Sequence, residues 1–444
     1  MVRIAFVGAG STVFARNLIG DLIAYPELRD RLSFSLHDID ERRLRTSEVV
    51  ANRIAATCDI PMTVEATTDR RKALEGADYV VTMFQVGGYE PSTVIDFEIP
   101  EKYGLQQTIA DTLGVGGIMR GLRTVPVLVD VSEDISEVAG DAVFLNYANP
   151  MAINMWGLAD LGSHPGYGLC HSIPLTASDL AHDLGIPADE LEYTAAGINH
   201  MAFYLKLEHH GQNVYPKLKT LFTDPADAPR RGERGMPDAV RYEIMRRLGY
   251  FVAESSEHFA EYTPWFIKRD RPDLIAEFQI PLREYIRRCE IHDAEWDALR
   301  SRLEDESVEL TIPHSGEFAP QIIHSIETDT QRTVYTNIPN QGHIDNLPDG
   351  CIVEVPTTVD GHGLSPQRVG ALPPQLAAVI QTNVGPQALT VEALKTGDRA
   401  HVYHAAMLDP HTAAELSLEQ IHNLVDDLLD AHGDYIPASL RDRT

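Results

Sequence analysis

The chain has few cysteines, and their spacing does not suggest that they pair. Its 444 residues include Cys58, Cys170, Cys289 and Cys351, and no two of them form a Cys-x-x-Cys motif. Scattered cysteines do not make the disulfide framework of a small secreted protein, so we expect a reducing, cytoplasmic location. The opening MVRIAFVGAG lacks the basic and apolar regions of a signal peptide, and no apolar run reaches the roughly 18 residues of a membrane span.

Positive charge is also scarce. The formal net charge is −29, and seven lysines stand against thirty arginines. A surface this acidic repels phosphate backbones and anionic lipids, which argues against nucleic acid or a membrane as a partner. The excess of acid fits adaptation to high salt, and it equally fits a genomic base composition that replaces lysine with arginine.

Strands alternate with helices in the first half of the chain. Apolar residues at helical spacing predict helices at 12–25, 41–57 and 122–139, and short apolar runs predict strands at 2–8, 33–40, 76–84, 142–150 and 166–172. The alternation predicts an α/β fold whose N-terminal part, residues 1–190, is a doubly wound Rossmann-like sheet.

Beyond residue 190 the pattern changes. Strand-like alternation covers 192–211, helical patterns cover 236–262 and 415–432, and 221–236 is polar and rich in Pro and Gly. We therefore expect residues 191–444 to form a mixed α+β domain.

A dinucleotide fingerprint stands where the first strand turns into the first helix. Gly8 permits the tight turn, Gly10 lets the backbone approach a pyrophosphate, and Ser11 and Thr12 open the helix. The third glycine is missing, with Val13 in its place, so the motif itself is weak and its position carries the prediction. Asp38 ends the second strand, where a carboxylate binds ribose hydroxyls and favours NAD over the phosphorylated cofactor.

Polar residues cluster at the ends of later strands. Residues 146–150 (NYANP) follow one predicted strand, 168–172 (GLCHS) follow the next, and 197–200 (GINH) come soon after. Ligands of an open α/β sheet lie beyond the carboxyl ends of its strands, so all three segments can face one crevice in front of a nicotinamide.

These residues resemble glycoside hydrolase family 4, of the α-galactosidase type. The resemblance is carried by VGAGST at the start, GGYEPSTVIDFEIPEKYG at 87–104, QTIADTLGVGGIMRGLRT at 107–124, NYANPM at 146–151, GLCHSI at 168–173, GINH at 197–200, RYEIMRRLGYF at 241–251, ESSEHFAEYTPWF at 254–266 and NQGHIDNLPDGCIVEVP at 340–356. It implies a Rossmann domain like that of malate and lactate dehydrogenases, NAD and usually manganese as cofactors, and a homodimer or homotetramer.

The chemistry implied by the resemblance differs from the usual pair of carboxylates. NAD takes a hydride from C3 of the sugar, a base removes the acidified C2 proton, the glycosidic oxygen leaves, water adds, and the hydride returns. Cys170 and His200 match the metal-binding residues of the family, and Asn149 matches a residue that contacts sugar hydroxyls. His171 is the expected general acid, and Asp111 is expected to contact the sugar or the nicotinamide.

The base is a tyrosine in part of the family, which makes Tyr262 the first choice here. Glu254, Glu257 and His258 are rivals, because this chain departs from the tyrosine pattern around ESSEH.

Other functions stay open at this point. Within the family, α-galacturonidase and α-glucosidase activities fit the same motifs. A plain NAD-dependent sugar or hydroxy-acid dehydrogenase would share the first domain, and an NAD-sensing regulatory protein would share the fingerprint but needs no metal pair.

Overall fold

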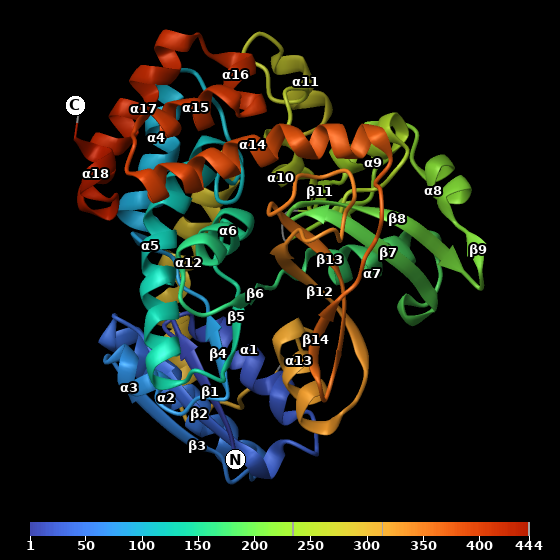
Figure 1. The fold of residues 1–444 in the computed structure, drawn as a ribbon. Helices are drawn as coiled ribbons and strands as arrows, with labels where there is room; N and C mark the ends of the chain where they lie inside the picture. Colours follow the sequence, from blue (N-terminus) through green and yellow to red (C-terminus); the bar gives the residue numbers. More distant parts are fainter. Residues whose placement is uncertain (233–234, 313, 443–444) are drawn as a thin grey trace.

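A computed structural model describes residues 1–232, 235–312 and 314–442 as one molecule built on a single long sheet (Figure 1). The first six strands are parallel and run in the spatial order β3-β2-β1-β4-β5-β6. Their bounds are β1 (Val2–Val7), β2 (Leu32–His37), β3 (Thr63–Thr67), β4 (Tyr79–Thr82), β5 (Val143–Asn146) and β6 (Gly166–Gly168). The predicted α/β class with a Rossmann-like N-terminal sheet is confirmed.

Helices cover both faces of this parallel part because its central strands are buried on both sides. In β1, Ile4 and Phe6 point to one face and pack in the core that α1 and α2 complete, while Ala5 and Val7 point to the other and pack with α5. The helices of this half are α1 (Thr12–Ile23), α2 (Glu41–Cys58), α3 (Arg70–Leu74), α4 (Val94–Lys102), α5 (Gly114–Val138), α6 (Met151–Leu161) and α7 (Ser172–Leu184).

The sheet continues into the second half of the chain through antiparallel strands. After β6 the order is β12-β13-β7-β8-β9, and β14 pairs with β13. These strands are β7 (Leu191–Ile198), β8 (Met201–His209), β9 (Gln212–Asn213), β12 (Arg332–Pro339), β13 (Ile352–Asp360) and β14 (Gly363–Pro366). One hydrogen-bonded sheet therefore crosses residue 190, and the division into domains at that residue stays a prediction.

The later helices are α8 (Tyr215–Leu221), α9 (Ala239–Leu248), α10 (Ser256–Glu261), α11 (Pro272–Glu277), α12 (Glu284–Glu304), α13 (Phe318–Thr328), α14 (Pro374–Thr396), α15 (Ala400–Leu408), α16 (Pro410–Glu415), α17 (Leu418–His432) and α18 (Ala438–Arg441). Among them, α14, α15, α16 and α17 lie together at the top of the view, α8 lies at the right, and α13 lies lower down near α1 (Figure 1). None of the described helices combines the length and apolar character needed to cross a lipid bilayer.

Among the sequence-predicted elements whose bounds differ in the structure, three differ most at one end. The strand expected at 142–150 ends at Asn146, and the one expected at 166–172 ends at Gly168. The helix expected to begin at residue 122 begins at Gly114. In the first two cases the polar residues after the strand belong to loops and helix starts, which is where the candidate site lies.

Candidate active site

The site forms where the parallel strands meet the antiparallel ones. Asn146 at the end of β5 is in register with Gly168 of β6, and Gly168 is also in register with Asn337 of β12. Glu354 of β13 is in register with Gly197 of β7. This pairing brings the three motifs at 146–150, 168–172 and 197–200 together at the ends of neighbouring strands.

Cys170, His200 and Glu254 form a group of metal-ligand type. One ligand atom from each lies within 4.8 Å of the others. His200 stands in the turn between β7 and β8 with a φ of +65°, and its Nε2 is 3.2 Å from Glu254 Oε2. A thiolate, an imidazole and a carboxylate suit a divalent transition metal, so the donor set fits such an ion. The sequence analysis proposed two of these residues as ligands and Glu254 only as a base.

The charges around this group are strongly coupled. Burial alone would raise the pKa of Glu254, but the neighbouring His200 and His258 outweigh it and hold that pKa at about 2. Burial, together with Glu354 and Glu254, raises the pKa of the Cys170 thiol well above its usual value. The thiol is therefore protonated without a cation, and metal binding must release that proton.

Asp111, His200 and His258 form a second group, which shares His200 with the first. His258 Nε2 is 3.8 Å from Asp111 Oδ1, and Asn149 Nδ2 is 3.4 Å from Asp111 Oδ2. Burial opposes ionisation of Asp111, yet His258, Arg120 and His200 together lower its pKa. Asp111 is thus an ionised acceptor next to the proposed sugar-binding amide of Asn149.

Tyr262 lies behind His200. Its side chain is fully buried, and its hydroxyl is 3.0 Å from His200 Nδ1. Because Nδ1 faces Tyr262, Nε2 is left to face Cys170 and Glu254, which fixes how the imidazole can bind a metal. Burial raises the pKa of the Tyr262 phenol well above its usual value.

His171 and Glu317 form a pair at the mouth of the site. His171 is the N-cap residue of α7, and its Nδ1 is 3.1 Å from Glu317 Oε1, just before α13. The hydrogen bond to Glu317 is the main reason that the pKa of His171 is raised, although burial opposes it. The imidazole keeps Nε2 free and is half-exposed, as a proton donor must be.

Glu257 differs from the other candidate bases. Its carboxylate lies 2.6 Å from Arg288 Nη2, on the neighbouring helix α12. It is not part of either group of metal-ligand type among the described residues.

The sequence analysis missed Glu261, which holds the loop carrying Asp111. Its carboxylate is buried and accepts backbone N–H groups from Thr108 at 2.7 Å, Ala110 at 2.8 Å and Ile109 at 3.2 Å. Glu317 and Glu354 were missed as well. All three contact residues more than 140 positions away, so no local motif marks them.

The fingerprint glycines have the geometry expected of a cofactor-binding turn. Gly8 has a φ of +93°, and a Cβ there would stand 2.7 Å from Phe84 Cβ. Asp38 Oδ2 accepts the Gly10 N–H at 2.7 Å, and Oδ1 accepts the Asp40 N–H at 2.8 Å. Each carboxylate oxygen keeps a second lone pair for a ribose hydroxyl.

The start of α1 is open to a phosphate, since its N-cap Ser11 makes no side-chain capping hydrogen bond. The predicted cofactor contact of Thr12 depends on its backbone. Its side chain is buried and its Oγ1 lies 2.8 Å from Ser47 Oγ, so it packs α1 on α2 and can meet a cofactor only through its backbone. Ile39, 91% exposed beside Asp38, offers apolar surface to a flat base ring.

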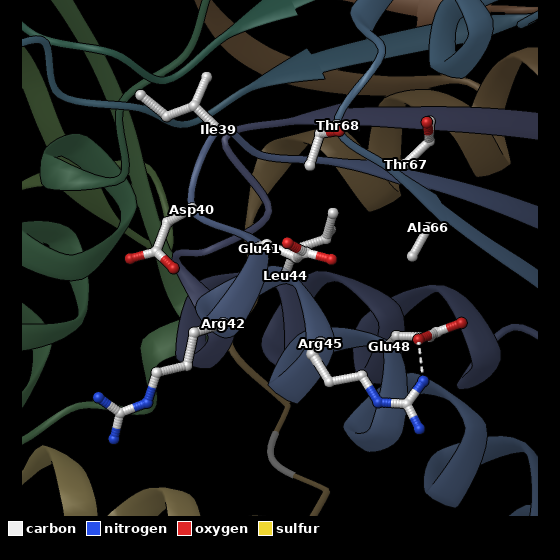
Figure 2. A pocket seen from close by; sticks show the side chains of 10 residues that line it. All are labelled: Ile39, Asp40, Glu41, Arg42, Leu44, Arg45, Glu48, Ala66, Thr67 and Thr68. Carbon is white, nitrogen blue, oxygen red and sulfur yellow. Dashed lines mark hydrogen bonds and ion pairs between the residues drawn. The ribbon is translucent and has the colours of Figure 1, made fainter.

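A separate pocket lies on the outer side of α2 (Figure 2). It is lined by Ile39, Asp40, Glu41, Arg42, Leu44, Arg45, Glu48, Ala66, Thr67 and Thr68. Arg45 and Glu48 pair with each other at 2.7 Å, and no residue of the metal-ligand groups lines this pocket. It is therefore separate from the metal-ligand groups, but it shares Ile39 with the proposed cofactor site.

Comparison with known proteins gives consistent matches over the chain. The profile of the family 4 glycosyl hydrolases matches residues 3–186, and that of the family 4 glycosyl hydrolase C-terminal domain matches residues 195–412. An α-galactosidase of Bacillus subtilis is 45% identical, over 98% of this chain and 99% of that protein. An α-galactosidase of Rhizobium meliloti is 35% identical, over 98% of this chain and 89% of that protein.

Solved structures share the fold. A Bacillus subtilis protein superposes with a TM-score of 0.86 at 25% identity, covering 96% of this chain and 99% of that one. A 6-phospho-α-glucosidase from gut microorganisms, solved in complex with NAD and Mn²⁺, superposes with a TM-score of 0.81 at 18% identity, covering 98% and 99%.

Proposed function

This chain belongs to family 4 of the glycosyl hydrolases, and from that premise we propose that it hydrolyses an unphosphorylated α-galactoside with NAD and a divalent metal. The observation that carries the proposal is the group formed by Cys170, His200 and Glu254 at the strand ends, in a chain 45% identical to an α-galactosidase. A metal beside a dinucleotide cleft suits oxidation and elimination in a sugar and is not needed by an NAD sensor.

We propose that Gly8, Gly10, Ser11 and Asp38 hold NAD. The positive φ of Gly8, the open N-terminus of α1 and the free lone pairs of Asp38 support this role. The negative charge of Asp38 would repel a 2′-phosphate, so the expected cofactor is NAD. Cys170, His200 and Glu254 would hold Mn²⁺ or another divalent cation.

The cofactors and the protein side chains have different roles in the proposed reaction. When bound, NAD accepts the hydride of C3 and later returns it, while the cation polarises the oxygens on C2 and C3. Asn149 and Asp111 would bind the sugar hydroxyls next to the cation. His171, held by Glu317, would donate a proton to the leaving glycosidic oxygen.

We propose Tyr262 as the base that removes the C2 proton. Its hydroxyl lies 3.0 Å from His200 Nδ1. With a cation on Nε2, Nδ1 would carry the proton and donate it to the Tyr262 oxygen, which would favour the phenolate. His258 is the next candidate, followed by Glu254, whose carboxylate is already assigned to the cation. Glu257 comes last, because its carboxylate is paired with Arg288.

A panel of nitrophenyl glycosides with NAD, Mn²⁺ and a thiol reductant tests the proposal. We expect the α-galactoside to be hydrolysed fastest, ahead of the α-galacturonide and the α-glucoside, without accumulation of NADH. Steady accumulation of NADH with free sugar would instead indicate a plain dehydrogenase. Faster hydrolysis of the galacturonide would instead indicate an α-galacturonidase of the same family.

Assembly and location complete the proposal. A homodimer or homotetramer is expected from the family resemblance. A cytoplasmic location is expected because a ligand thiolate is protected from oxidation in a reducing compartment.

A further inference from the structure

Arg120 is a buried arginine that, within the described residues, lacks the ion pair made by other buried arginines of the protein. It lies on α5 and is 6% exposed. Within the described residues no carboxylate approaches its guanidinium to the 4.0 Å of an ion pair, and its Nε has no hydrogen-bond partner. The ring of Tyr285 lies beside it, with its centroid 5.9 Å from Cζ; burial lowers the pKa of the guanidinium, but Tyr285 and Asp111 raise it.

The same helix shows what a structural arginine looks like in this protein. One turn further along α5, Arg123 is also buried, but it makes a two-pronged ion pair with Asp96 and donates from Nε to the carbonyl of Val86. Arg241 on α9 is matched by Asp238 in the same manner. A buried guanidinium without such a partner is costly, which calls for an explanation other than packing.

The surroundings of Arg120 connect it to the proposed sugar site. Tyr285, whose ring it faces, donates its backbone N–H to the Thr108 carbonyl at 3.0 Å, in the loop that carries Asp111. Tyr285 also donates its hydroxyl to Gln85 at 3.2 Å, just after β4. Arg120 is therefore held next to the loop of Asp111, in agreement with its place among the charges that lower the pKa of that carboxylate.

We infer that Arg120 is a specificity-determining residue that donates hydrogen bonds to the C4 or C6 hydroxyl of the sugar. This inference rests on the proposed function. The chemistry and the cation occupy the C2 and C3 oxygens, so a donor elsewhere in the site is left with the other two hydroxyls. A hydroxyl can donate to Asp111 and accept from Arg120, whereas a phosphate or carboxylate in that place would be repelled by Asp111.

The experiment measures kcat and KM of wild type, Arg120→Met and Arg120→Lys on three nitrophenyl α-glycosides: the galactoside, its 6-deoxy analogue and the glucoside, which is its C4 epimer. Arg247→Met, at a largely exposed arginine on α9, is the matched control. NAD affinity, bound Mn²⁺ and the thermal midpoint are measured for every variant.

We expect Arg120→Met to lower kcat/KM for the galactoside about 10- to 100-fold, as for the loss of a charged hydrogen bond, with most of the change in KM. The penalty should be clearly smaller for the 6-deoxy analogue if the contact is with the C6 hydroxyl, and for the glucoside if it is with the C4 hydroxyl, which has the opposite configuration there. A further variant, Arg120→Ala, is assayed with added guanidinium, which should restore part of the activity. Arg247→Met should behave as wild type.

An equal loss on all three glycosides, with no rescue by guanidinium, would overturn the inference and assign Arg120 to packing. The proposed function fails separately, since it is judged on the wild type alone: no hydrolysis of the galactoside by wild type would refute it before any variant is compared.

Discussion

We expect Glu261→Gln to lower the activity indirectly, because the Glu261 carboxylate binds backbone N–H groups of the loop that carries Asp111. The two carboxylate oxygens have separate donors: Thr108 N–H reaches Oε2 at 2.7 Å and Ala110 N–H reaches Oε1 at 2.8 Å. A glutamine keeps one acceptor and turns an NH₂ group toward the other N–H. The substitution therefore removes at least one charged hydrogen bond and leaves a buried donor unsatisfied.

The loss is about 2–3 kcal/mol for one such bond, which corresponds to roughly 30- to 150-fold in an equilibrium between the correct loop and displaced ones. A displacement of Asp111 by about 1 Å can cost a similar factor in rate. We expect kcat/KM on the α-galactoside to fall about 100-fold, while NAD affinity stays within a factor of two, since Gly8 and Asp38 are remote from the loop.

The assay is best run at pH 8, because burial raises the pKa of Glu261 to about 7 despite its backbone N–H partners. Glu243→Gln is the control: that carboxylate also accepts from more than one donor, Arg246 and Arg247, but lies on α9 away from the site. Wild-type kcat/KM in Glu261→Gln, with an unchanged thermal midpoint, would refute the claim that this carboxylate positions Asp111.

Three further outcomes follow from the same site. Cys170→Ser should lose activity and bound Mn²⁺, while its affinity for NAD, measured by titration calorimetry, persists. Full activity of this variant in the presence of chelator would show that the reaction does not need the metal. A 6-phosphogalactoside should react more slowly than the free galactoside. By the family resemblance, phosphoglycosidases carry an arginine in the segment that matches residues 87–93, whereas residues 89–92 (YEPS) here offer one acid and no cation. Kinetics on both substrates decide it, and a faster phosphorylated substrate would contradict it. Burial and Lys268 hold the pKa of His411 at about 4, so the folded protein keeps it neutral while the unfolded chain protonates it near 6.5. The contribution of His411 to the free energy of unfolding, up to about 3 kcal/mol, is complete above pH 6.5 and is lost as the pH falls toward 4. Thermal unfolding at pH 7 and 4.5 should therefore show a smaller pH dependence for His411→Gln than for wild type. An identical pH dependence would contradict this assignment.

Local patterns predicted the parallel half of the fold well. The apolar runs at 2–8 and 33–40 became β1 and β2, and Asp38 follows β2 as the fingerprint requires. Such strands are buried on both faces, so their sequence shows continuous apolar runs that can be recognised without knowing the partner strand.

The pairing of strands that lie far apart in the chain could not be predicted from the sequence. Residues 332–360 supply β12 and β13, which enter the sheet between β6 and β7 and carry Asn337 and Glu354 to the site. Nothing in their local pattern indicates which strand they pair with, because register depends on contacts across the whole fold. The motifs at 168–172 and 197–200 could be placed by the strand-end rule, whereas the partners of Glu261 and Glu317 could not.

The most direct test of the central claim is turnover of the α-galactoside in deuterated water. If the sugar is oxidised at C3 and loses its C2 proton to a protein base, water addition restores a hydrogen taken from solvent at C2. Mass spectrometry and NMR of the released galactose should therefore show deuterium at C2 in NAD- and Mn²⁺-dependent turnover. Released sugar carrying only protium at C2, at full turnover in heavy water, would contradict the oxidation–elimination route and the role proposed for NAD.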